Sequence, residues 1–216
     1  MRVVIAGGHG QIALRLEKLL AARGDEAVGI VRNPEHVTDL ETVGARAVVL
    51  DLEKSDVDAV VKVLEGADAA IFSAGAGPGS GTARKDTVDR GAAALFGEAA
   101  ERAGVRRHIQ VGSMGTDKLD SPAFSPEFRV YLEAKKAAED DLRARDLDWT
   151  ILRPGQLTDD PGTGLVYLSD STGRGKIPRD DVARALVGLL DAPETAGRTL
   201  ELISGDLTVA EALATL

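Results

Sequence analysis

The chain has 216 residues, with 26 Lys and Arg against 35 Asp and Glu, so its net charge at neutral pH is −9. Hydrophobic residues make up 44% and charged residues 28%, the composition of a globular domain that buries a sizeable core. The acidic balance, with no basic run longer than Arg106 and Arg107, argues against a nucleic-acid-binding surface and against attraction to anionic membranes. The absence of cysteine excludes disulfides, thiolate metal sites and a cysteine nucleophile.

Short apolar segments alternate with longer helical patterns along most of the chain. The segments span residues 2–6, 27–31, 45–50, 69–72, 108–111 and 149–152. They are rich in Val and Ile and do not alternate strictly with polar residues, as expected of strands that helices cover on both faces. The helical stretches between them end at Gly24, Gly44, Gly66 and Gly104. This pattern predicts an α/β fold, a doubly wound parallel sheet with helices on both faces.

Three irregular segments, residues 73–84, 113–125 and 153–164, each follow a predicted strand. They are therefore expected at the carboxyl ends of the strands, where open α/β sheets bind ligands. The C-terminal part is expected to contain strands at 165–169 and 199–203, a helix at 180–190 and a final helix that opens at Thr208 with a capping box to Glu211. We expect one domain over residues 1–216, with residues 156–216 as a short substrate-side annex.

The first strand runs into the stretch GGHGQIA, in which Gly7, Gly10 and Ala13 fit the spacing of a dinucleotide-binding loop. Glycines are needed there because the turn is tight and the backbone approaches a pyrophosphate, and the small Ala13 lets the helix pack on the strand. The helix that begins with Gln11 and Ile12 offers free N–H groups to phosphates. A purely structural glycine turn is the alternative, but the position between a strand and a helix favours a cofactor site.

The end of the second strand bears on the choice of cofactor. An NAD site usually has Asp or Glu about 20 residues after the glycines, on the ribose hydroxyls. Here the stretch GIVRNP ends the strand with Arg32 and no adjacent acid. An arginine can hold a 2′-phosphate through charge-assisted hydrogen bonds, so the sequence favours NADP over NAD. The alternative interpretation is that Arg32 is a solvated loop charge.

These features resemble the short-chain dehydrogenase/reductase superfamily, and most closely its small atypical NAD(P)-binding, NmrA-like and epimerase/dehydratase-type members. The resemblance covers nearly the whole chain. It rests on GGHGQIA, VRN at 31–33, DLE at 51–53, SAG at 73–75, VGS at 111–113, YLEAK at 131–135 and LRPG at 152–155. It implies a Rossmann-like fold and NAD(P) binding, and none of the motifs specifies a substrate.

The resemblance also implies roles for individual residues. Asp51 and Leu52 would border the adenine ring, Ser73, Ala74 and Gly75 the ribose and pyrophosphate, and Pro154 and Gly155 the nicotinamide. Asp89 stands where active members of the superfamily often have Asn, and it looks like the substitution found in the atypical group. The short annex argues against a nucleotide-sugar substrate.

Ser113, Tyr131 and Lys135 would form the catalytic group by the same resemblance. In a helix expected over residues 126–145, Tyr131 and Lys135 stand at i and i+4 and share a face. A nearby ammonium lowers the pKa of a tyrosine from about 10, so that Tyr131 can donate a proton while Ser113 holds a substrate carbonyl. An ordinary amphipathic helix, with the lysine in solvent, is the alternative, and the cofactor loop together with Ser113 favours the site.

We therefore expect an NADP(H)-dependent oxidoreductase that transfers a hydride to a small carbonyl, quinone or flavin. An NADP(H)-sensing regulatory protein without turnover and an NAD(P)-dependent epimerase or isomerase are the alternatives. The stretch MRVVIAGG shows no signal-peptide layout, so we expect a cytoplasmic protein. Its expected partner is a small-molecule substrate, and the sequence does not indicate an oligomeric state.

Several other charged residues do not suggest a site. His9, His36 and His108 share no ligand-like spacing, so no metal is predicted. The acidic run at residues 139–141 is expected to be solvated surface. The basic cluster of Arg102, Arg106 and Arg107 is expected to be a solvated helix end.

Overall fold

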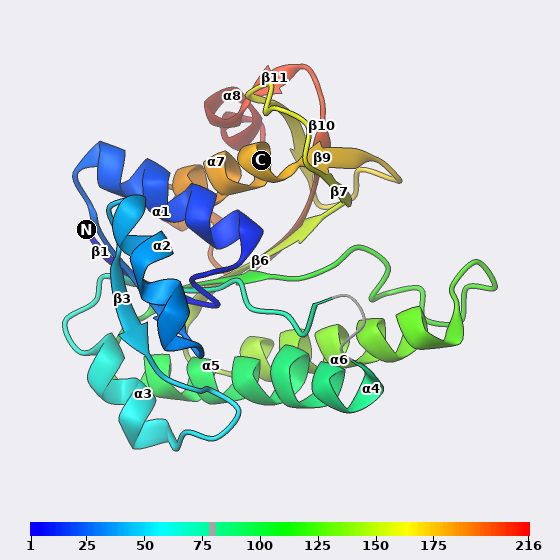
Figure 1. Cartoon of the computed structure of the whole chain (residues 1–216). Coiled ribbons are helices and arrows are strands. Elements are labelled where there is room, and N and C mark those ends of the chain that lie inside the picture. Colours follow the sequence, from blue (N-terminus) through cyan, green and yellow to red (C-terminus); the bar gives the residue numbers. More distant parts are fainter. Residues whose placement is uncertain (78–80) are drawn as a thin grey trace.

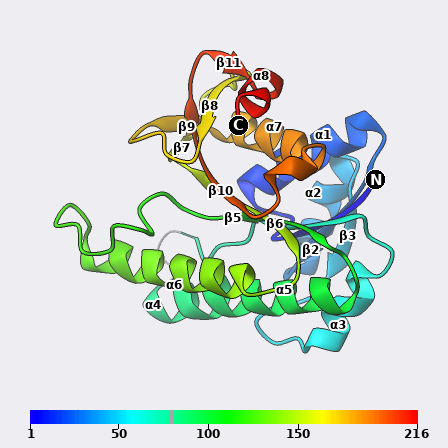
Figure 2. The ribbon, with the colours of Figure 1, turned by 180° about the vertical axis from the view of Figure 1, so that it is seen from behind.

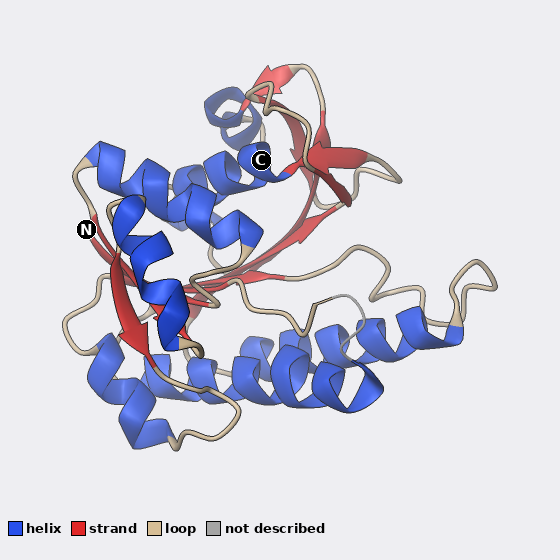
Figure 3. Cartoon of the chain, viewed as in Figure 1, coloured by secondary structure: helices blue, strands red, loops and turns tan. Residues whose placement is uncertain are grey.

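The computed structural model describes residues 1–77 and 81–216. In these residues a nine-stranded sheet has the order β11-β8-β10-β6-β5-β4-β1-β2-β3, and β7 and β9 pair separately. The strands are β1 (Arg2–Ala6), β2 (Glu26–Val31), β3 (Arg46–Val49), β4 (Ala69–Phe72), β5 (Arg107–Val111), β6 (Asp148–Pro154), β7 (Gln156–Thr158), β8 (Leu165–Ser169), β9 (Lys176–Pro178), β10 (Arg198–Ser204) and β11 (Leu207–Thr208). Figure 3 shows the strands as one layer between two groups of helices.

The α-helices are α1 (Gln11–Arg23), α2 (Val37–Thr42), α3 (Val57–Leu64), α4 (Gly81–Arg84), α5 (Ala93–Arg102), α6 (Pro126–Arg143), α7 (Arg179–Leu190) and α8 (Val209–Ala214). Two 3₁₀ turns, η1 (Pro34–His36) and η3 (Pro193–Thr195), and a π-helical segment, η2 (Lys85–Ala92), complete the elements. Helices α4, η2 and α5 follow one another directly along the chain, beside α6 (Figure 1).

The order of the strands confirms the predicted α/β class. From β3 to β10 every neighbouring pair is parallel, as crossover helices require. The sheet then continues with β8 and β11, which pair antiparallel at its far edge. The strands of the C-terminal segment therefore extend the main sheet, because β10 pairs directly with β6.

Two hydrophobic clusters, one on each face of the sheet, form the core. Val3 and Ile5 of β1 belong to the cluster beneath α1 and α7, whereas Val4 belongs to the cluster beneath α3, α5 and α6. Successive side chains of a strand point to opposite faces, so a strand covered on both sides is apolar throughout, as the sequence indicated. Figure 2 shows the same two helix layers from behind. Burial of each large side chain such as Leu16 or Phe96 contributes about 2 kcal/mol.

Local sequence explains where helices α6, α8 and α1 begin. Helix α6 has Ser125 at its N-cap, where the hydroxyl accepts a hydrogen bond from the Phe128 amide at 3.2 Å, and Pro126 occupies the first turn. Helix α8 begins with the predicted capping box of Thr208 and Glu211. Helix α1 begins after Gly10 without a side-chain cap, which leaves its first amides free for a ligand.

Two expectations about surface charge were wrong. Glu139 is fully buried in α6, because it pairs with Arg153 and Arg143 instead of facing solvent. Arg107 is a partly buried residue of β5 that donates hydrogen bonds to the carbonyls of Asp148 (2.9 Å) and Leu189 (2.7 Å). No helix in residues 1–77 and 81–216 is long and apolar enough to cross a membrane.

Candidate functional site

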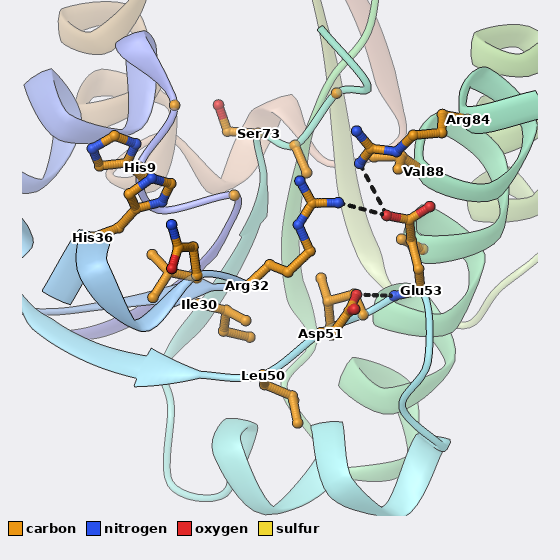
Figure 4. A pocket seen from close by; sticks show the side chains of 18 residues that line it. His9, Ile30, Arg32, His36, Leu50, Asp51, Glu53, Ser73, Arg84 and Val88 are labelled. Carbon is orange, nitrogen blue, oxygen red and sulfur yellow. Dashed lines mark hydrogen bonds and ion pairs between the residues drawn. The ribbon is translucent and has the colours of Figure 1, made fainter. Parts of the chain in front are cut away.

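A first cavity of about 240 Å³ lies at the carboxyl ends of β1, β2 and β4. The residues that line it are Gly7, His9, Gly10, Ile30, Val31, Arg32, Asn33, His36, Leu50, Asp51, Leu52, Glu53, Ser73, Ala74, Gly75, Arg84, Val88 and Ala92. Figure 4 shows the polar side chains around it, with Arg32, Arg84 and Glu53 turned toward one another. This is the edge at which open parallel sheets bind ligands.

The glycine loop passes close to the segment that follows β4. Gly7 has φ +80°, and a Cβ there would lie 2.7 Å from the Cα of Ala74. The Gly10 amide donates to the Gly7 carbonyl at 2.8 Å, which closes the turn before α1. These contacts explain why glycines are needed here, and the loop before α1 lines the cavity with Gly7, His9 and Gly10.

Two arginines meet one carboxylate at the outer end of this cavity. Glu53 Oε2 accepts hydrogen bonds from Arg84 Nη2 at 2.9 Å and from Arg32 Nη1 at 3.2 Å. Glu53 Oε1 accepts a hydrogen bond from the Thr87 hydroxyl at 2.6 Å. These donors, the Thr87 hydroxyl first, hold the pKa of Glu53 below its ordinary value. We call Glu53, Arg32, Arg84 and Thr87 the Glu53 cluster.

Two histidines that are far apart in the sequence stack at the opposite side of the first cavity. The rings of His9 and His36 have centroids 3.6 Å apart and are inclined by 11°. His9 Nε2 lies 2.8 Å from Asp39 Oδ2. Within the part of the chain that the structure describes, no group of three or more His, Asp or Glu is arranged to hold a metal ion.

A second cavity of about 680 Å³ lies beside the loops that follow β5 and β6. It is lined by Ser113, Met114, Gly115, Asp117, Lys118, Ser121, Phe124, Phe128, Tyr131, Pro154, Gly155, Gln156, Asp170, Ser171, Gly173, Arg174, Gly175 and Glu201. Phe124, Phe128 and Tyr131 form a row of rings, with successive centroids 5.2 Å and 5.7 Å apart. One wall of the cavity is thus aromatic, and the opposite wall comes from the C-terminal segment.

Lys135 lies beneath Tyr131 and is buried. Its Nζ donates to the Val111 carbonyl at 3.2 Å, lies 3.2 Å from Asp89 Oδ1, and is 5.9 Å from the centre of the Tyr131 ring. Burial alone lowers the pKa of Lys135, but the phenol of Tyr131 and the carboxylates of Asp89 and Glu139 outweigh burial, and the pKa is raised. The lysine therefore carries a fixed positive charge next to Tyr131.

Arg153 joins the elements that surround the second cavity. Its guanidinium donates to both carboxylate oxygens of buried Glu139 on α6, at 3.0 Å and 2.5 Å. It also donates to Asp117, in the segment of residues 113–125, with one of the two contacts at 3.2 Å. Arg153 belongs to β6, so one side chain ties the strand, the helix of Tyr131 and the loop of Ser113 together.

The structure brings most of the predicted site residues to two neighbouring positions. Gly7, Gly10, Arg32, Asp51, Leu52, Ser73, Ala74 and Gly75 line the first cavity, and Ser113, Tyr131, Pro154 and Gly155 line the second. Asp89 lies below Gly75 and accepts a hydrogen bond from the Ala76 amide at 3.3 Å. Gln11 and Ile12 line neither cavity: Ile12 is buried in the core, and Gln11 accepts a hydrogen bond from Arg15.

Sequence reasoning did not single out several residues that the cavities contain. Arg84 lines the first cavity and Arg174 the second, and Thr87 hydrogen-bonds to Glu53 beside the first. Nothing in their local pattern differs from that of a solvated charge or hydroxyl. The stretch AFSPEF around Phe124 and Phe128 was the one available signal, because two aromatic residues are conspicuous in a chain with 3% aromatic residues.

A Rossmann-type sheet with this glycine loop defines an NAD(P)-binding protein. The family model described as NAD(P)H-binding matches residues 7–193, and the chain belongs to that family. The predicted resemblance to atypical short-chain dehydrogenases/reductases is thereby confirmed, and the relatives described next include oxidoreductases and epimerases.

Three similar proteins illustrate the range of activities for which relatives of this chain are named. The chain is 37% identical over 214 residues to the Bacillus subtilis protein named "uncharacterized sugar epimerase YhfK", with 99% of each chain covered. The solved structure of a Bacillus halodurans protein named after NAD-dependent epimerases/dehydratases is 35% identical, with a TM-score of 0.93 over the whole of both chains. ChuY, an anaerobillin reductase of Escherichia coli O157:H7, is 26% identical with a TM-score of 0.80, covering 96% of this chain and 99% of ChuY.

Proposed function

We propose that the protein is an NADP(H)-dependent oxidoreductase that reduces a carbonyl, quinone or flavin bound in the second cavity. The observation that carries the proposal is the buried ammonium of Lys135, whose Nζ lies 5.9 Å from the ring centre of Tyr131. Tyr131 itself lines the cavity together with Ser113. In this proposal Tyr131 is the proton donor, Lys135 is its charge partner and Ser113 supplies the hydroxyl for the substrate oxygen, the three groups that carbonyl reduction requires.

In this proposal the adenosine and pyrophosphate part of NADP would occupy the first cavity. Gly7, Gly10 and the main chain of Gln11 and Ile12 would bind the pyrophosphate at the helix N-terminus, and Arg32 would bind the 2′-phosphate. Asp51 and Leu52 would border the adenine, Ser73, Ala74 and Gly75 the ribose and pyrophosphate, and Pro154 and Gly155 the nicotinamide. When bound, the reduced nicotinamide supplies the hydride.

The chain's own residues would handle the proton. The Ser113 hydroxyl donates a hydrogen bond to the substrate oxygen, and Tyr131 transfers its phenolic proton to that oxygen as the hydride reaches carbon. The ammonium of Lys135 stabilises the phenolate that remains, and Asp89 keeps that ammonium in position. A proton from solvent then restores Tyr131 before the next turnover.

Residues 156–216 form the substrate-side annex in this proposal. Gln156, Asp170, Arg174 and Glu201 come from this segment and line the cavity opposite the aromatic row. Differences in this segment would then change the substrate while the cofactor site stays the same, as is usual when binding loops vary on a constant scaffold.

An epimerase is the second candidate, because the Bacillus subtilis relative carries that name. Such an enzyme oxidises and then reduces its substrate, so it consumes no cofactor overall. A sensor without turnover would bind NADPH and show neither reaction. Net NADPH consumption therefore separates the reductase from the other two classes, and conversion of substrate without net consumption separates the epimerase from the sensor.

The test is NADPH oxidation by the wild type and Tyr131→Phe across aldehydes, quinones and flavins. Loss of the hydroxyl should lower turnover of a carbonyl by about 10²–10⁴ and leave NADPH affinity nearly unchanged. Tyr167→Phe is the matched control, because Tyr167 is exposed on β8. Equal rates for wild type and Tyr131→Phe on every carbonyl would contradict the proton-donor role, and equal rates on flavins alone would indicate transfer of hydride without it.

A further inference from the structure

The Glu53 cluster has an excess of cationic donors around one acceptor. Arg32 follows β2 and Arg84 ends α4, so the chain brings two guanidinium groups from distant segments to a single carboxylate. Figure 4 shows both guanidinium groups directed at Glu53, beside the Asp51 carboxylate. The side chains of Arg32 and Arg84 remain 56% and 37% exposed, so both are free to turn toward a ligand.

A 2′-phosphate next to Arg32 would meet this carboxylate. A phosphate monoester carries about two negative charges and needs the donors that Glu53 now occupies. Glu53 is ionised, because the Thr87 hydroxyl and the two arginines favour its charged form. The carboxylate therefore opposes the phosphate in two ways, by occupying its donors and by like-charge repulsion.

We propose that Glu53 is an internal counter-ion that sets the affinity for the 2′-phosphate, and that Arg84 is a second phosphate-binding residue beside Arg32. Without a phosphate, Glu53 holds both guanidinium groups at the mouth of the cavity and neutralises part of their charge. With a phosphate, both arginines exchange the carboxylate for it. The inference rests on the proposed preference for NADP.

The counter-ion role of Glu53 predicts how Glu53→Gln changes nucleotide affinity. The amide keeps the size of the side chain but has no charge, so it competes more weakly for the arginines. Affinity for a nucleotide with a 2′-phosphate should rise about tenfold, which is about 1.4 kcal/mol. Affinity for the same nucleotide without that phosphate should stay within about twofold, because the carboxylate opposes only the phosphate.

The experiment compares adenosine 2′,5′-bisphosphate with adenosine 5′-monophosphate, which differ only by the 2′-phosphate. Calorimetric titration of the wild type, Glu53→Gln and Arg84→Met gives six dissociation constants at one salt concentration. Arg84→Met should weaken the bisphosphate about tenfold and leave the monophosphate unchanged. Glu41→Gln is the control for net charge, because Glu41 is exposed on α2, away from the cavity.

The outcomes distinguish this inference from the proposed cofactor preference. If Glu53→Gln changes neither ligand, or changes both equally, Glu53 is not the counter-ion and the inference is overturned. If Arg84→Met leaves the bisphosphate unchanged, Arg84 does not bind the phosphate and that part is overturned. If the wild type shows no preference but Glu53→Gln acquires one, the counter-ion role is supported and the assignment of NADP as the natural cofactor fails.

Discussion

Lys135 Nζ lies 3.2 Å from Asp89 Oδ1, and the two side chains are 5% and 1% exposed. The pair joins α6 to the π-helical segment η2 and so connects the helix of Tyr131 to the segment beneath Gly75. A buried ion pair contributes little compared with an apolar pair of the same size, but the loss of one partner leaves an unpaired buried charge. Lys135 therefore affects both the stability of the fold and the chemistry at Tyr131.

Lys135→Met should lower the free energy of unfolding by about 3 to 5 kcal/mol, because Asp89 is left buried without its cation. Lys135→Met combined with Asp89→Leu should recover most of that loss, since neither partner of this pair is then left as an unpaired charge. Urea unfolding of the two variants and of Asp89→Leu completes a double-mutant cycle. If the double variant is as unstable as Lys135→Met, the pair is not the source of the destabilisation.

Gly10→Val should abolish NADPH binding without unfolding the protein. Gly10 has φ −65° and ψ 150°, which any residue adopts, but its Cβ would lie 3.0 Å from the Gly7 carbonyl oxygen, in the loop that lines the first cavity. Fluorescence titration with NADPH and a melting curve measure both effects. Gly66→Ala is the inverse control: φ is +71° with open space around the Cβ, so it should cost about 1 kcal/mol of stability and keep binding.

The repeating strand–helix pattern was sufficient to predict the parallel sheet. The segments at residues 2–6 and 69–72 match β1 and β4, because strands buried on both faces are apolar throughout. A strand at 165–169 was expected, but its antiparallel pairing was not predictable in the same way, because β8 and β11 are partly exposed and their pairing depends on β10 being in place.

The site was predictable where a motif fixes the backbone and not where distant side chains meet. Gly7 and Gly10 follow from the geometry of a phosphate loop, whereas Glu53 and Arg84 meet only in the folded chain. Glu139 shows the same limit: in the sequence it begins an acidic run, and only the approach of Arg153 from β6 explains its burial.

Glu17 should make stability depend on pH. Its carboxyl group is fully buried between Gly8 and Gly29 with no hydrogen-bond partner among the described residues, and burial raises its pKa from 4.5 to about 8. The protonated form is favoured on folding, so this stabilisation is complete below pH 4.5 and is lost as the pH rises to about 8. The loss is at most about 1.4 kcal/mol per pH unit in that window.

Glu17→Gln removes the titrating group and should flatten the fall in unfolding free energy across that window. Urea unfolding at several pH values between those limits, for wild type, Glu17→Gln and the exposed control Glu41→Gln, measures the difference. The Glu41 variant should keep the slope of the wild type. Parallel curves for wild type and Glu17→Gln would show that the buried carboxyl does not titrate in this range.

Asp117→Asn should loosen the segment that carries Ser113. The carboxylate of Asp117 receives two hydrogen bonds from Arg153, and Arg153 holds the pKa of Asp117 below its ordinary value. Because the Asp117 side chain is 65% exposed, global stability should change by less than about 1 kcal/mol. Local opening of residues 113–125 should become easier, since Arg153 is their link to β6 and α6.

Hydrogen exchange of the backbone amides in residues 113–125 measures this opening without any knowledge of the substrate. A weakening of about 1 kcal/mol should speed their exchange about fivefold, while the amides of β4 and β5 stay unchanged. Asp120→Asn is the matched control, because Asp120 is exposed in the same segment. If the two variants exchange alike, Arg153 and Asp117 do not hold the loop. If only Asp117→Asn is faster, a carbonyl substrate should also show a raised KM with little change in kcat, because the cavity wall is displaced while Tyr131 and Lys135 stay in place.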